Sequence, residues 1–306
     1  MVRQKPAKLP SLSSNLSATY FFSGIKPMLY LASTPIGNLG DITLRTLETL
    51  KNCTLILCED TRHSAPLLLH YKIEVPLQSY HKFNESAKIA PLLVRLKNGE
   101  DIALITDAGT PLISDPGLLL ARACLEQNTP ITALPGACAP IVALTLSGFN
   151  AELFQFVGFL PKLTSALAEK CIEMLCYSGT SIAFESPHRL KESLALIDKL
   201  DKKRRVCVLR EMTKKFEERI CGSASEVLSH FSGEIKGEIV LLIEGALDKP
   251  KWPDLFTAEE AIKAEVEWLS KSFSLPLQDA IKLCAKISDT PKRLIYKHFI
   301  NEHKTP

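Results

Sequence analysis

The stretch IALITDAGTPLISDPG, residues 102–117, joins an apolar run to a loop of small residues, prolines and two carboxylates. Residues 102–105 have the length and composition of a buried strand. In an α/β protein, a buried strand that ends in such a loop brings main chain against a ligand at the carboxyl edge of a parallel sheet. This stretch therefore predicts a ligand site as well as a fold.

Two similar junctions flank this stretch. Residues 29–33 are an apolar run before the loop TPIGNLGD (34–41), and residues 131–133 precede LPGACA (134–139). Three such loops at one edge of a sheet would surround a single small molecule. The GNLG segment lacks both the three-glycine dinucleotide fingerprint and the lysine of a phosphate loop, which disfavours a Rossmann or Walker nucleotide site.

Composition fits a folded enzyme of two or three domains. The 306 residues are 46% hydrophobic and 23% charged, and the net charge of +3 is too small to identify a nucleic-acid-binding protein. The nine cysteines include no Cys-x-x-Cys pair, so we expect neither disulfides nor a zinc or other metal site, but buried thiols in a reducing cytoplasm. No apolar run reaches the roughly 18 residues that a membrane span needs.

Strands and helices alternate from Met28 onward. Apolar runs predict strands at 29–33, 54–58, 102–105 and 131–133, and amphipathic patterns predict helices at 42–50, 86–96, 117–126 and 139–146. This βα repetition predicts an α/β fold with a mostly parallel sheet that is covered by helices on both faces.

The second half has a different pattern. Residues 154–162, which contain Gly158 and Pro161, predict a connector at a domain boundary. Strands are expected at 181–184, 205–211, 218–221 and 238–244, and helices at 163–176, 187–200 and 224–231. Two consecutive strands without a helix between them predict a mixed sheet. Beyond Pro250 only helical patterns occur, near 258–272, 277–285 and 291–299.

These patterns divide the chain into four parts. We expect a basic, disordered extension at 1–27, an α/β domain at 28–153, a second, mixed α/β domain at 154–250 and a helical region at 251–306. The extension has four basic residues, five serines and no acidic residue, so an organelle transit peptide is an alternative to a start at Met28.

Several motifs allow both a functional and a structural interpretation. The carboxylates of Glu59 and Asp60 follow an expected strand, where they could act as a base or cap the next helix. His81 lies in a polar stretch in which a histidine is more often a surface residue than a catalytic one. Arg189 follows another expected strand and, taken alone, suits the start of a helix. All of these residues lie at the same end of successive strands.

Together, the motifs resemble the ribosomal RNA small subunit methyltransferase I family of the tetrapyrrole methylase superfamily. The similarity runs from about Met28 to the carboxyl end, and its specificity comes from the order of long motifs. They are STPIGNL (33–39) with DIT (41–43), EDTR (59–62), YH (80–81) with NE (84–85), the stretch 107–117, PG (135–136), ESPHRL (185–190), RE (210–211) with TK (213–214), and KGE (236–238).

The resemblance implies a fold and an activity. The fold would be two α/β domains of the tetrapyrrole methylase type with the cofactor in the interdomain cleft, followed by a small helical region. The activity would be S-adenosyl-L-methionine-dependent 2′-O-methylation of a cytidine ribose in small-subunit (16S) ribosomal RNA, within the assembled subunit. The protein would be a cytoplasmic homodimer without a membrane partner.

Site residues are carried over from the resemblance. It places the cofactor against main chain and small side chains at Leu39, Ala108, Gly109, Thr110, Ile113, Cys138, Ala139, Ser186 and Met212. It implies Glu59 or His81 as the catalytic base. Asp107 and Asp115 could serve the cofactor loop or cap its helix, and Asp60, Arg62 and Arg189 could hold phosphate or organise the loops.

Two other functions remain open. A methylase acting on tetrapyrroles or other small molecules is the nearest alternative, although such enzymes carry a Gly-x-Gly-x-Gly-like first loop that this chain lacks. A non-catalytic ribosome-assembly factor is suggested by basic residues at 199–205 and in the helical tail, at Lys292, Arg293 and Lys297.

Overall fold

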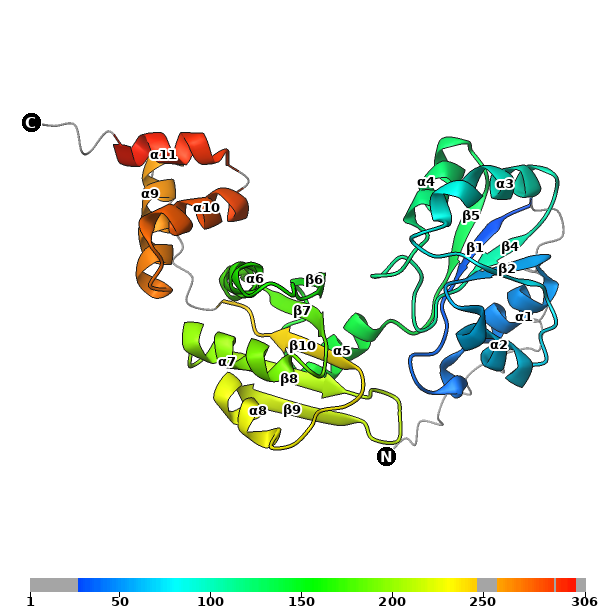
Figure 1. Cartoon of the computed structure of the whole chain (residues 1–306), viewed down its shortest axis with the longest axis horizontal. Coiled ribbons are helices and arrows are strands. Elements are labelled where there is room, and N and C mark those ends of the chain that lie inside the picture. The colour runs from blue at the N-terminus through cyan, green and yellow to red at the C-terminus, as the bar shows by residue number, and fades with distance from the viewer. Residues whose placement is uncertain (1–26, 247–257, 289, 301–306) are drawn as a thin grey trace, which may run out of the picture.

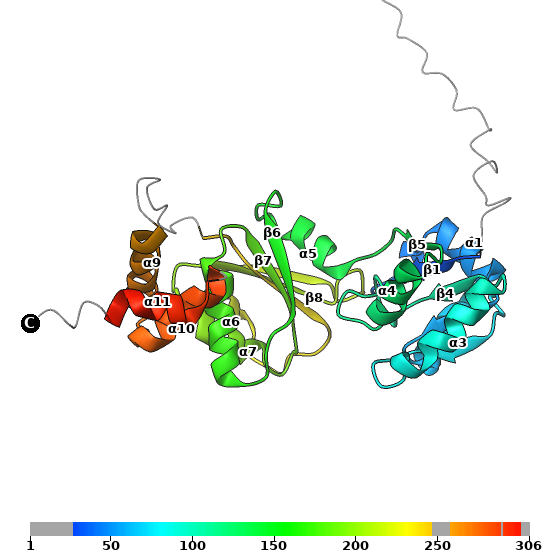
Figure 2. The same cartoon turned by 90° about the horizontal axis from the view of Figure 1, so that it is seen from above.

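The computed structural model describes residues 27–246, 258–288 and 290–300. The extension expected at the amino end lies outside the described residues, apart from position 27. Figures 1 and 2 agree on an arrangement of three bodies in a row. A first sheet with its helices occupies one end, a second sheet lies in the middle, and helices α9–α11 lie at the far end.

The first sheet is parallel, as predicted. Its strand order is β3-β2-β4-β1-β5, and the strands are β1 (Leu29–Ala32), β2 (Leu55–Cys58), β3 (Leu77–Ser79), β4 (Ile102–Leu104) and β5 (Ile131–Leu134). Five helical elements accompany them: the 3-10 turn η2 (Leu39–Asp41), α1 (Leu44–Asn52), α2 (Thr61–His70), α3 (Glu85–Lys97) and α4 (Leu118–Glu126).

Helices cover both faces of this sheet, which confirms the layered α/β prediction. Leu57 and Leu104 pack with α3 and α4 in one apolar cluster. Ile56 and Ile105 point to the other face and pack with α1 and α2. This alternation follows from the two-residue period of a strand.

The second sheet is mixed, as expected from its consecutive strands. Its order is β6-β7-β10-β8-β9, with β6 parallel to β7 and the other neighbours antiparallel. The strands are β6 (Phe154–Phe159), β7 (Thr180–Glu185), β8 (Arg205–Arg210), β9 (Glu218–Ser223) and β10 (Ile239–Ile243), and the helices are α6 (Thr164–Cys176), α7 (Leu190–Leu200) and α8 (Ala224–His230).

The expectation of a connector at 154–162 is wrong, because most of this segment forms the strand β6. Its pairing with β7 shifts register between Phe156 and Phe159, and Gly158 has φ +73° within that shift. An irregularity of this kind disrupts the alternation of apolar and polar residues that identifies a strand in sequence.

Helix α5 (Ala139–Ser147) packs on the second sheet, although it was expected within the first domain. Ala143 and Leu144 belong to a cluster with Ile182, Leu209 and Leu242. Figure 1 shows α5 beside β10. The chain thus crosses from the first sheet to the second between β5 and α5.

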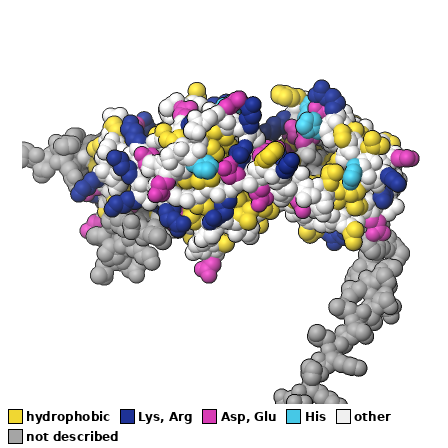
Figure 3. Space-filling view, turned by 90° about the horizontal axis from the view of Figure 1, so that it is seen from below, with side chains coloured by type: hydrophobic (Ala, Val, Ile, Leu, Met, Phe, Trp, Pro, Cys, Tyr) yellow, Lys and Arg dark blue, Asp and Glu magenta, His cyan; other side chains and the backbone are white. Residues whose placement is uncertain are grey.

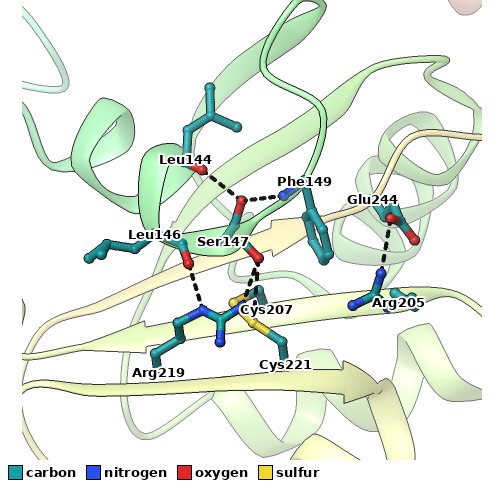
Figure 4. The surroundings of a disulfide bond; sticks show 9 residues. All are labelled: Leu144, Leu146, Ser147, Phe149, Arg205, Cys207, Arg219, Cys221 and Glu244. Atoms are coloured by element: carbon teal, nitrogen blue, oxygen red, sulfur yellow. Dashed lines mark hydrogen bonds and ion pairs between the residues drawn. A yellow bond between two sulfur atoms is a disulfide. The ribbon is translucent and has the colours of Figure 1, made fainter.

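The expectation that cysteines would remain unpaired is wrong for one pair. Cys207 on β8 and Cys221 on β9 face each other in the antiparallel register, with Cα atoms 4.1 Å apart, and form a disulfide. Figure 4 shows Arg219 nearby on β9, which donates to the carbonyls of Leu146, at 2.5 Å, and Ser147, at 3.0 Å. These bonds satisfy carbonyls at the end of α5 and fix it to the second sheet.

The helical tail consists of α9 (Ala258–Ser272), α10 (Leu277–Ile287) and α11 (Lys292–Ile300), close to the three expected ranges. Its core includes Val266, Ile281 and Ile295, and it packs on Ile172 and Cys176 of α6. Among the helices in the described ranges, none has the length and apolar character needed to cross a membrane.

Candidate functional site

The loops that follow β1, β4 and β5 are hydrogen bonded to one another. Thr34 and Gly109 form a two-way backbone bridge, with N···O distances of 2.9 and 3.1 Å. The Thr110 hydroxyl lies 3.1 Å from the Ser33 hydroxyl and donates to the carbonyl of Ala137 at 2.9 Å. The three loops expected to share one ligand therefore form a single connected wall.

This wall closes one side of a cavity of about 460 Å³, and the second domain closes the other. That volume lies within the usual range for small-molecule sites. The lining residues come from both domains: Ile36, Asp107, Ala108, Gly109, Thr110, Ile113, Ser114, Asp115, Cys138, Ala139, Pro140, Phe159, Phe184, Glu185, Ser186, Pro187, Met212, Gly237, Glu238, Ile239 and Val240.

The ionisable side chains that line the cavity are acidic. Four carboxylates, those of Asp107, Asp115, Glu185 and Glu238, face it, and among the described residues that line it there is no lysine, arginine or histidine. Because Glu185 pairs with Arg189 and Glu238 pairs with Lys214, the negative charge of the lining comes from Asp107 and Asp115, and it favours a cation over a phosphate group. The remaining walls are apolar side chains and exposed main chain.

Eight of the nine residues predicted to bind a cofactor line this one cavity. They are Ala108, Gly109, Thr110, Ile113, Cys138, Ala139, Ser186 and Met212. The ninth, Leu39, lies outside the lining, in the turn η2, where its side chain is 42% exposed and its carbonyl accepts a hydrogen bond from the Tyr71 hydroxyl.

Gly37 allows the two domains to approach each other closely. A Cβ atom at this position would lie 2.5 Å from Lys214 Cγ and 2.9 Å from the carbonyl oxygen of Met212. Any side chain here would therefore push the first loop away from residues 212–214 of the second domain. That contact holds the two sides of the cavity together.

Unusual backbone conformations occur in both loops that line the cavity. Leu112 and Ser114 each have φ +72°, and Glu211 and Thr213, which flank Met212, have φ +52° and +66°. Such values are costly for residues with a side chain and are found preferentially at functional sites.

Arg189 organises the second domain's side of the cavity. Its guanidinium lies 2.5 Å from Glu185 Oε1 and donates to the carbonyls of Pro161, at 2.8 Å, and Leu160, at 3.2 Å. Glu185 also accepts from Ser193 Oγ at 2.5 Å. Of the two roles considered for Arg189, the contacts favour loop organisation over phosphate binding.

Asp60 and Arg62 form an exposed pair at the start of α2. Asp60 accepts from the Arg62 backbone N–H at 2.8 Å and pairs with its guanidinium at 2.7 Å. These hydrogen bonds hold the pKa of Asp60 at about 2. The Arg62 side chain is 87% exposed.

Neither predicted base lines the cavity. His81 lies after β3, and its Nε2 is 3.0 Å from the amide nitrogen of Asn84. Glu59 follows β2 and is close enough to Asp115 for its negative charge to raise the pKa of that residue.

The Asp115 carboxylate has a raised pKa. Burial, followed by the negative charges of Glu59 and Asp107, raises its pKa from 3.8 to about 7, and Lys82 acts in the opposite direction. It does not cap α4, whose N-cap is Gly117 with no side-chain cap bond. No sequence pattern separated this carboxylate from Asp107, and none pointed to Phe159, Phe184 or Glu238.

Comparison with known proteins agrees with this architecture. The family described as Tetrapyrrole (Corrin/Porphyrin) Methylases matches residues 28–228. A Ribosomal RNA small subunit methyltransferase I from Vibrio cholerae is 41% identical over 277 residues, which cover 89% of this chain and 93% of the relative. The protein of that name from Bacillus subtilis is 38% identical over 283 residues, covering 90% and 95% of the two chains.

A solved structure supports the fold alone. The uroporphyrin-III C-methyltransferase from Thermus thermophilus, complexed with S-adenosyl homocysteine, has a TM-score of 0.50 at 16% identity, covering 71% of this chain and 97% of that one. The fold, the cavity lined by both domains, and the sequence identity to relatives along nearly the whole chain lead to one assignment. The chain belongs to the ribosomal RNA small subunit methyltransferase I family of tetrapyrrole methylases.

Proposed function

We propose that this protein transfers a methyl group from S-adenosyl-L-methionine to the 2′-oxygen of a cytidine ribose in small-subunit ribosomal RNA. The observation that carries the proposal is the acidic cavity between the two domains, in a chain whose relatives are named as methyltransferases of that RNA. The cytidine and the ribose oxygen come from the family resemblance.

The cavity fits this cofactor in charge, and it exposes main chain to it. When bound, the cofactor supplies a methyl group on a positively charged sulfur, and a second positive charge lies on its amino group. Four lining carboxylates and no lining cation among the described residues suit such a ligand. Gly109, at φ +85°, exposes main chain to the cavity, where a Cβ atom would lie 3.3 Å from Ile36 Cγ2.

The chain's own residues would hold and orient the reactants. Main-chain groups at 108–110 and 138–139 can hydrogen-bond the polar parts of the cofactor, while Ile36, Ile113 and Met212 contact its apolar surfaces. Alignment of a ribose oxygen with a methyl group can itself supply up to about 7 to 11 kcal/mol of the barrier reduction.

The surface near the cavity suits a nucleotide taken out of an RNA helix. Phe159 lines the cavity yet is 63% exposed, and it packs on Phe184 with ring centroids 5.2 Å apart. Proteins recognise such nucleotides by stacking bases on aromatic side chains, because they cannot read the deep major groove of RNA.

Lysine and arginine side chains would grip neighbouring phosphates. On the face in Figure 3 they are spread over the molecule, including the end with α9–α11, and alternate with acidic side chains. In α11, Lys292, Arg293 and Lys297 are exposed. We assign the RNA grip to this helical tail.

The test is a map of ribose methylation in ribosomal RNA from cells with and without this protein. We expect one 2′-O-methylcytidine of the small subunit to disappear and to return with the wild-type chain, but not with a variant that cannot bind the cofactor. Purified naked RNA and assembled subunits, offered separately, show which is the substrate. An unchanged map would contradict the proposal.

We also infer a homodimer that acts in the cytoplasm, and this rests on the resemblance to the superfamily. Pairing would widen the platform available to RNA. Light scattering at micromolar concentration tests the assembly, and a mass of one chain would contradict it.

A further inference from the structure

Asp115 is the lining carboxylate that remains without a partner in the described part of the chain. Glu185 accepts from the Ser186 backbone N–H at 2.6 Å and pairs with Arg189, and Glu238 pairs with Lys214 at 3.0 Å. Asp107 has weaker neighbours, the backbone N–H of Asp60 at 3.4 Å and His63 at 3.9 Å. The oxygens of Asp115 are therefore free to contact a ligand in the cavity.

Close packing and unusual backbone angles constrain the loop around Asp115. Leu112 and Ser114, on its amino-terminal side, hold φ +72°. On the other side Gly117 has φ +125°, and a Cβ atom there would lie 2.5 Å from Leu104 Cδ2 of β4. A carboxylate on such a loop keeps its position when a ligand arrives, which proton transfer requires.

Charged groups from three neighbouring strand ends surround this carboxylate. Glu59 follows β2, Asp107 follows β4 and Lys82 follows β3. With burial, they bring its pKa to about 7, which is the value at which a carboxylate is both ionised and basic near neutral pH. Glu59 lies outside the cavity lining, and its negative charge acts on Asp115.

We propose that Asp115 accepts the proton of the ribose 2′-hydroxyl, and that Glu59 is a positioning residue that acts through it. This deepens the proposed function and rests on it. The hydroxyl oxygen forms a bond to the methyl carbon while the carbon–sulfur bond breaks and its electron pair stays on sulfur. The hydroxyl proton passes to the Asp115 carboxylate, which releases it to water afterwards.

The test is single-turnover methyl transfer on small subunits that lack the modification, measured from pH 5.5 to 8.5. For the wild type we expect the rate to rise about tenfold per pH unit and to level off near the pKa of Asp115. Asp115→Asn should slow transfer by about 100- to 10,000-fold, because a placed base supplies that factor, and should remove the inflection. The assay uses saturating S-adenosyl-L-methionine and saturating subunits, so the lower cofactor affinity expected from the loss of one lining carboxylate does not enter the measured rate.

Two further variants separate the roles. Glu59→Gln removes one negative charge beside Asp115, so the inflection should move to lower pH while both ligands still bind. Glu126→Gln, an exposed carboxylate at the opposite end of α4, is the matched control and should reproduce the wild-type profile. A direct readout is an NMR titration of the Asp115 carboxyl carbon in the full chain, with a midpoint near pH 7.

The outcomes distinguish failure of this inference from failure of the proposed function on which it rests. If the wild type leaves ribose unmethylated, the proposed function fails. If the wild type methylates ribose and Asp115→Asn does so at the full rate, the proposed function stands and the proton acceptor is another group. An inflection that Glu59→Gln does not move would overturn the role of Glu59.

Discussion

Asp115→Asn should stabilise the protein above neutral pH. The folded state binds a proton at Asp115 up to about pH 7, whereas the ordinary pKa is 3.8. Between these values the folded state holds more protons than the unfolded state, so rising pH lowers stability at this residue. Above pH 7 the full penalty remains, and asparagine removes it.

The size of the effect follows from the shift. A displacement from 3.8 to about 7 corresponds to about 4 kcal/mol at one pKa unit per 1.4 kcal/mol. Because the side chain is half-buried, solvent screening reduces this to about 2 kcal/mol. We therefore expect Asp115→Asn to match the wild type near pH 4 and to exceed it by about 2 kcal/mol at pH 8.

Urea unfolding followed by circular dichroism at pH 4, 5, 6, 7 and 8 measures this difference. Asp60→Asn is the control: Arg62 lowers the pKa of Asp60 to about 2, so its contribution is fully present above pH 4 and lost only as pH falls towards 2. The difference between Asp60→Asn and the wild type should be constant from pH 5 to 8. A difference for Asp115→Asn that is equally constant would refute the reasoning.

Three other substitutions test the cavity and the tail. Gly109→Ala should weaken S-adenosyl-L-methionine binding at least tenfold by calorimetry. The control is Gly99→Ala, because Gly99 also has positive φ (+100°) but has nothing within 4 Å of its Cβ position, so this variant should lose only about 1 kcal/mol of stability from the backbone. Equal cofactor affinities of the two variants would contradict the placement of Gly109 in the cavity. Gly37→Ala should lower cofactor affinity by separating the first loop from residues 212–214, and unchanged affinity would show that the loops tolerate the methyl group. Subunit binding and its salt dependence should decrease, with cofactor affinity unchanged, when alanine replaces three tail residues together: Lys292, Arg293 and Lys297.

The sequence predicted the elements with strong periodicity. Buried strands such as β2 and β4 and helices such as α7 and α10 stand close to their expected ranges. The misses have local causes. Helix α2 contains Pro66, β3 has only three residues, and β6 includes a register shift at Gly158, so each lacks the pattern that identifies its type.

The disulfide and the position of α5 depend on pairing that a sequence does not display. Cys207 and Cys221 are 14 residues apart in sequence, and only the β8–β9 register sets them opposite each other. Helix α5 has apolar residues on most of its surface, so its pattern fits either sheet. The contacts of its buried face with β7, β8 and β10 settle the choice.

The sequence predicted those parts of the candidate site whose position depends only on where the parallel strands end. Loops after parallel strands meet at one edge, and the loops after β1, β4 and β5 do so around the cavity. The position of Glu59 required the strand order. Because β4 lies between β2 and β1, the loop after β4 lines the cavity, whereas no residue directly after β2 does. Adjacency to a strand end therefore does not by itself place a residue in the cavity lining.

The 106–117 loop combines several features that are each costly to a folded chain. Leucine and serine occupy left-handed conformations there, and Asp115 is half-buried without a hydrogen-bond partner among the described residues. Each feature costs stability, and the same short loop also supplies the main chain at 108–110 to the cofactor cavity. Sites that bind and react are where such costs are tolerated. The expected gain in stability of Asp115→Asn and its expected loss of methyl transfer would then be two measurements of one property, a carboxylate held where it is poorly solvated and strongly basic.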